Sequence, residues 1–83
     1  MNKILFVEGL SLVTKTAILE DVFQKFQGYK EVRHIHEKKV AFVEFDNEDF
    51  STMAMSNVNG YQISEANGEV STLRISYAKK WAN

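Results

Sequence analysis

The chain contains no cysteine and no proline. Without cysteine it can form neither disulfides nor thiolate-based sites, so a fold of this length depends on its apolar core alone. No apolar run approaches the ~18 residues that cross a bilayer, and we expect a soluble intracellular protein with no membrane partner. Neither sign of charge is in excess, since 10 Lys and Arg residues balance 11 Asp and Glu residues. A broad attraction to polyanions is therefore excluded, and any nucleic-acid site must be a local patch.

The remaining composition is typical of one globular domain, with 45% hydrophobic and 25% charged residues over 83 positions. We assign residues 1–83 to that domain. Hydrophobic periodicity predicts strands at 4–8, 29–35, 40–45 and 72–77, and helices at 15–26 and about 47–57. A short extended stretch at 61–63 and a polar loop at 64–69 precede the last strand. The order β-α-β-β-α-β predicts an α+β, ferredoxin-like sandwich, in which a four-stranded antiparallel sheet carries both helices on one face.

Local signals place the ends of the predicted helices. Thr14 is the expected cap of the first helix, and Gly28 stands where a left-handed stop is needed. Asp46 provides a capping side chain for the second helix, followed by acids in the first turn, where the helix dipole favours them.

Catalytic and metal-binding patterns are missing from the sequence. There is no Gly-rich phosphate loop and no nucleophile with a base beside it, so we predict a non-enzymatic protein with no cofactor and no small-molecule substrate. Acylphosphatases share the predicted topology, but they need an arginine in the loop after the first strand, and residues 9–14 contain none. His34 and His36 could share a strand face, yet a metal needs a third ligand, and we interpret them as surface histidines.

Strand alternation places two aromatic side chains on the uncovered face of the predicted sheet. Leu5, Val7 and Val43 point toward the helices, so Phe6 and Phe42 point away from them on the two central strands. The same alternation directs further side chains outward: Ile4, Glu8, Val40, Glu44, Arg74 and Ser76. A purely structural sheet does not need an exposed phenylalanine pair, which indicates a binding surface.

Two segments on these strands resemble known motifs. Residues 5–10, LFVEGL, resemble the RNP-2 hexamer of the RNA recognition motif, and residues 38–45, KKVAFVEF, resemble its RNP-1 octamer. The resemblance spans nearly the whole chain in element order and spacing. Several segments also resemble the second RNA recognition motif of the spliceosomal snRNP A and B-double-prime proteins: 4–7, 22–26, 28–33, 41–48 and 75–80.

The resemblance implies a nuclear module of an snRNP or pre-mRNA splicing factor that binds single-stranded RNA, with other splicing proteins as possible partners. In that family bases stack on the sheet aromatics, and Phe6 and Phe42 match two stacking positions. Arg33, His34, His36, Lys38 and Lys39 form a basic cluster where the family borders RNA. The predicted RNA-binding site comprises Phe6, Phe42, Val40, Lys38, Arg74, Glu44, Arg33, Lys79 and Lys80.

The sequence departs from the family pattern at several of these positions. Val40 stands at the other outward aromatic position of the octamer, and Lys39 replaces the family's glycine. Glu8 occupies a position where RNA-binding relatives carry donors. Glu8 and Glu44 repel phosphate unless Lys38 or Arg74 neutralises them. We therefore expect weak, salt-sensitive RNA binding.

Other interpretations stay open at this point. The chain can be a protein-interaction module that has lost measurable RNA binding, with Glu20 and Asp21 on an acidic docking surface. The tail can also fold back, with Trp81 as a lid over the two phenylalanines. The basic cluster and the terminal lysines can simply be solvated. The abrupt end at Asn83 suggests a domain excised from a longer protein.

Overall fold

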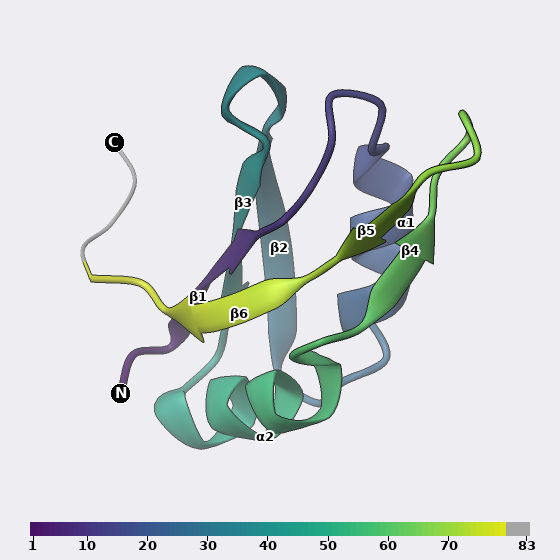
Figure 1. Ribbon diagram of the computed structural model, residues 1–83. Coiled ribbons are helices and arrows are strands. Elements are labelled where there is room, and N and C mark those ends of the chain that lie inside the picture. Colours follow the sequence, from purple (N-terminus) through teal and green to yellow (C-terminus); the bar gives the residue numbers. More distant parts are fainter. Residues whose placement is uncertain (80–83) are drawn as a thin grey trace.

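The computed structural model describes residues 1–79 and forms two layers, a sheet and the helices that cover it (Figure 1). The elements in chain order are β1 (Ile4–Glu8), α1 (Thr16–Phe23), β2 (Tyr29–Ile35), a 3-10 turn (His36–Lys38), β3 (Val40–Phe45), α2 (Glu48–Val58), β4 (Gln62–Ser64), β5 (Val70–Thr72) and β6 (Arg74–Tyr77). Four strands form an antiparallel sheet in the order β2-β3-β1-β6. The predicted ferredoxin-like fold and the central position of β1 and β3 are confirmed.

Both helices pack against the same face of this sheet. The strand residues that face them alternate with outward residues, as a pleated strand requires. One apolar cluster joins these residues to the helices: Leu5, Val7, Ala41, Val43 and Phe45 from β1 and β3, Leu19, Val22 and Phe23 from α1, and Ala54 and Val58 from α2. Burial of each large side chain contributes about 1.5–3 kcal/mol, so the core fixes which sheet face is covered and leaves the other uncovered.

The first helix is shorter than predicted and starts differently. It begins at Thr16 with Lys15 as the N-cap residue, and no side chain caps it. The predicted cap, Thr14, is buried and uses its hydroxyl elsewhere. The helix ends at Phe23, three residues earlier than predicted. Gly28 does adopt the expected left-handed conformation, with φ of 83°.

The start of α2 follows the predicted chemistry with a different capping residue. Asn47, not Asp46, is the N-cap, and its side-chain oxygen accepts a hydrogen bond from the Phe50 amide at 3.0 Å. Glu48 and Asp49 occupy the first turn, where carboxylates are stabilised by the helix dipole.

The last predicted strand, 72–77, is divided in two at Leu73. β5 pairs with β4 in a separate hairpin, whereas β6 pairs with β1 in the main sheet (Figure 1). Leu73 bonds instead to the turn after α2: its amide donates to the Tyr61 carbonyl, and its carbonyl accepts from the Gly60 amide. These bonds satisfy the backbone at the break, so the chain can change partner strands there.

A buried carboxylate joins this hairpin to the loop between β1 and α1. Glu65, predicted to lie in a polar loop, is only 8% exposed. It accepts hydrogen bonds from the hydroxyls of Thr14 at 2.5 Å, Ser71 at 2.6 Å and Ser11 at 3.3 Å. Burial alone would raise the pKa of Glu65, but the hydrogen bonds from the three hydroxyls lower it by more than burial raises it. The pKa of Glu65 therefore lies below its ordinary value of 4.5. The charged form is therefore the one that the fold stabilises.

Candidate nucleic-acid interface

The register of the strands arranges the uncovered face in rows. The middle row runs across all four strands: Arg33, Phe42, Phe6 and Ser76. A second row lies toward the end of β1 and contains Ile35, Val40, Glu8 and Arg74. A third lies toward its start and contains Glu31, Glu44 and Ile4. The outward orientation predicted for the β1, β3 and β6 residues of these rows is confirmed by the register, although Ile4 is buried.

The two phenylalanines form the centre of the face. Phe6 and Phe42 are direct partners across β1 and β3, and their ring centroids lie 5.1 Å apart with a 44° angle between the ring planes. Both rings are half-buried. They line a hollow of about 280 Å³ together with Ser76, Tyr77 and Lys79. This hollow offers aromatic surface, a hydroxyl and an ammonium group in one place.

Each acidic side chain on the face has a cation beside it. Arg74, one of the two cations that the sequence offered for this role, lies 3.8 Å from Glu8, whereas Glu44 is paired with Lys3 at 3.6 Å and not with Lys38. Sequence reasoning missed Lys3, which precedes β1 by one residue and has no pattern of its own. The Arg74–Glu8 pair is exposed, and exposed ion pairs contribute about 0–1 kcal/mol each, so a ligand can replace either partner of this pair at small energetic cost.

The β2 edge of the face has a third such pair, in which the Arg33 Nε lies 2.8 Å from Glu31. Beyond it, the 3-10 turn presents Lys38 and Lys39, which are both exposed. Lys39 has a left-handed backbone, with φ of 59°. This conformation explains why a glycine suits the position and why a lysine there is strained.

The two histidines belong to the other side of β2. His34 pairs with Ala41, a core residue, so its side chain lies on the helix side, where its Nδ1 is 2.8 Å from the Thr16 hydroxyl. The His36 ring stacks on it with a centroid distance of 3.7 Å. Burial, and secondarily the charge of His36, lowers the pKa of His34 below 6.5. His34 is therefore not part of the predicted basic cluster. Within residues 1–79 no group of acidic or histidine side chains could hold a metal ion.

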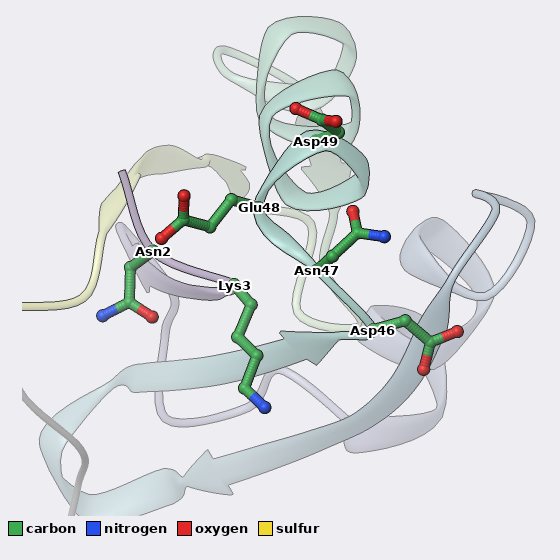
Figure 2. Close-up of a pocket in the computed structure, with 6 residues that line it drawn as sticks. All are labelled: Asn2, Lys3, Asp46, Asn47, Glu48 and Asp49. Atoms are coloured by element: carbon green, nitrogen blue, oxygen red, sulfur yellow. The ribbon is translucent and has the colours of Figure 1, made fainter.

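A larger hollow of about 600 Å³ lies at the start of α2 (Figure 2). Its lining residues are Asn2, Lys3, Asp46, Asn47, Glu48 and Asp49. Figure 2 shows the Lys3 side chain extending away from α2 and from the carboxylate of Asp49. Three carboxylates repel a phosphate backbone, so this hollow does not fit a nucleic acid and the Phe6–Phe42 hollow is the better candidate.

The structure brings together most of the predicted site residues. Phe6, Phe42, Val40, Glu44, Arg33 and Arg74 share the uncovered face, Lys79 lines the hollow beside the rings, and Lys38 lies in the adjoining turn. Lys80 and Trp81 lie outside the described residues. No helix within residues 1–79 is long and apolar enough to cross a membrane.

The amino-acid sequence is similar to those of plant small nuclear ribonucleoproteins. The chain is 39% identical over 80 residues to U2 small nuclear ribonucleoprotein B'' of Oryza sativa and 36% identical to that of Arabidopsis thaliana. Each match covers 95% of this chain and 33% of the relative, so the chain spans about a third of the length of these relatives.

Solved structures with the same fold include two RNA recognition motif domains. The MEC-8 C-terminal RRM domain bound to AGCACA has a TM-score of 0.78 and 33% identity, with 99% of this chain and 96% of that chain covered. The second RRM domain of yeast poly(U)-binding protein has a TM-score of 0.76 and 25% identity, with both chains fully covered. Residues 5–77 match the RNA recognition motif family. Together with the sheet topology and the two motif-bearing central strands, this match shows that the chain belongs to the RNA recognition motif family.

Proposed function

We propose that this chain binds single-stranded RNA on its uncovered sheet face, as part of a nuclear snRNP or pre-mRNA splicing factor. The observation that carries the proposal is the half-buried Phe6–Phe42 pair at the centre of that face, beside a hollow that Lys79 lines. A nucleobase has a flat apolar face and its phosphate is anionic, so the rings and the lysine match the two parts of a nucleotide. The similarity to U2 small nuclear ribonucleoprotein B'' supports the splicing assignment.

The affinity of this face is expected to be low. Each stacked base contributes about 1–3 kcal/mol, so two stacks supply about 2–6 kcal/mol, whereas a micromolar complex needs about 8 kcal/mol. The rest must come from phosphate contacts, yet two of the cations on this face, Lys3 and Arg74, are already paired with Glu44 and Glu8. We therefore expect a dissociation constant that is micromolar or weaker at physiological salt.

Leucine variants of the two rings test the proposal. Phe6→Leu and Phe42→Leu keep an apolar side chain but remove the stacking surface. We expect each to weaken binding of a fluorescein-labelled single-stranded RNA by about 5- to 100-fold in fluorescence anisotropy. Tyr61→Leu is the matched control, because Tyr61 is an exposed aromatic residue outside the main sheet. Equal affinities for the wild type and both phenylalanine variants would contradict the proposal.

A protein partner is the second candidate, and a patch away from the sheet face favours it. Leu12 in the β1–α1 loop is 67% exposed, and Val13, Ile18 and Val70 are exposed as well. Val13 lines one hollow with Leu12 and another with Ile18, so these three side chains are close together, and exposed apolar side chains in one region can mark a protein contact. A pull-down with the tagged chain, with and without nuclease, separates the candidates. A partner that stays bound after nuclease treatment supports protein docking, and one that is released supports RNA binding.

A further inference from the structure

One side-chain pair on the uncovered face has unused hydrogen-bonding capacity. Glu8 at the end of β1 lies directly opposite Arg74 at the start of β6. The carboxylate and the guanidinium are 3.8 Å apart, too far for a hydrogen bond, and their side chains are 41% and 71% exposed. Within residues 1–79 neither side chain makes another polar contact. The pair therefore presents an acceptor group and a donor group side by side to solvent.

The position of this pair relative to the rings sets what it can reach. Glu8 is two residues beyond Phe6 on the same strand and the same face, a separation of about 7 Å along the strand. A base that stacks on Phe6 and points toward the end of β1, away from the hollow that Lys79 lines, directs one of its edges toward Glu8 and Arg74. Glu44, by contrast, is less exposed, with 16% of its side chain accessible, and it lies opposite a second carboxylate, Glu31.

We propose that Glu8 and Arg74 select guanine on the RNA that this face binds, an inference that rests on the proposed function. The Watson–Crick edge of guanine presents two adjacent donors, N1–H and the N2 amino group, and one acceptor, O6. The two Glu8 carboxylate oxygens accept from both donors, and the Arg74 guanidinium donates to O6. Adenine and cytosine each offer one amino group and uracil one ring N–H, so none of them satisfies both carboxylate oxygens through adjacent donors.

The proposal also explains a departure from the family pattern. A carboxylate on an RNA-binding face repels phosphate and weakens binding to any sequence. A carboxylate that accepts hydrogen bonds from a base instead raises the affinity for the one base that has matching donors. Any other base leaves the carboxylate without its hydrogen bonds and is bound more weakly. Glu8 thereby acts as a specificity-determining residue, and Arg74 offsets its charge when no guanine is bound.

Inosine provides the sharpest test, because it differs from guanosine only in lacking the 2-amino group. Anisotropy titrations compare two labelled pentanucleotides, UUGUU and UUIUU, where I is inosine. We expect the wild type to bind the guanosine RNA about tenfold more tightly, since one hydrogen bond to a charged group is lost. In Glu8→Gln, whose amide has a single acceptor oxygen, the ratio should fall close to one. Glu20→Gln on α1 is the matched control and should keep the wild-type ratio.

The outcomes separate this inference from the function on which it rests. Equal wild-type affinities for the two RNAs, or an unchanged ratio in Glu8→Gln, would overturn the selection of guanine while leaving RNA binding intact. Absence of binding by every oligonucleotide, with no shifts of the β1 and β3 amides in NMR spectra, would overturn both. The wild-type ratio needs no variant, so the test remains decisive even if Glu8→Gln does not fold.

Discussion

Glu65 should be one of the most important polar residues for the stability of this domain. It is the shared acceptor for three hydroxyls, and two of their residues, Thr14 and Ser71, are 1% and 8% exposed. In Glu65→Ala, water cannot easily reach those two hydroxyls, whereas half-buried Ser11 is rehydrated more readily. A buried hydroxyl left without its partner costs about 1–3 kcal/mol. Two of them give an expected loss of about 2–6 kcal/mol, a large share of the ~5–15 kcal/mol that stabilises a typical domain.

The pH dependence of Glu65→Gln gives the same prediction a second readout. The folded-state pKa of Glu65 lies below its ordinary value of 4.5. Its stabilising contribution is therefore fully present above pH ~4.5 and is lost as the pH falls through the lower folded-state pKa. Glutamine does not titrate, so the gap in free energy of unfolding between wild type and Glu65→Gln should be largest near neutral pH and shrink in acid.

Urea denaturation followed by far-UV circular dichroism, repeated at several pH values between about 7 and 3, measures both effects. Glu69→Gln is the matched control, because Glu69 lies in the same hairpin turn but is exposed. It should change the free energy of unfolding by less than about 0.5 kcal/mol. A loss as small as this in Glu65→Ala, or a gap that stays constant down to low pH, would refute the reasoning.

Three further predictions follow from the backbone and from the half-buried His34. Lys39→Gly should raise the free energy of unfolding by about 0.5–1 kcal/mol in urea denaturation, because it relieves a left-handed lysine, whereas Lys38→Gly should not raise it. Gly9→Ala should lower the free energy of unfolding by about 2 kcal/mol or more in urea denaturation, because the new methyl group would clash with the Thr72 carbonyl oxygen; an unchanged value would contradict this. In an NMR titration His34 should show a pKa below 6.5, and stability should fall as the pH drops from 6.5 through that value; a normal pKa would contradict its burial.

The uncovered face could be predicted from sequence because strand alternation is a local property. Once residues 4–8 and 40–45 are assigned to strands, the positions of Leu5 and Val43 in the core direct Phe6 and Phe42 to the opposite side. The register then brings the two rings together. The outward positions of Glu8 and Arg74 follow from the same rule, whereas their pairing comes from the register. Most of the residues on this face could therefore be predicted from the sequence.

The features that the sequence did not reveal depend on contacts between distant segments. Glu65 resembles any loop glutamate until the fold brings Thr14, 51 positions away, within hydrogen-bonding distance. The same contact explains why Thr14 does not cap α1. The break at Leu73 likewise depends on carbonyl and amide groups of the turn after α2. Local periodicity contains no information about such partners, so it predicts one long strand and an ordinary polar loop.

The most direct test of RNA binding is to observe the ring protons of Phe6 and Phe42 by NMR while single-stranded RNA is added. Stacked bases should shift both sets of ring resonances upfield and produce cross-peaks between ring and base protons. The amides of β1 and β3 should shift with them, while those of α1 should not. RNA binding that leaves both rings unshifted, or that maps to the helix side, would contradict the assignment of the Phe6–Phe42 pair as the nucleobase platform.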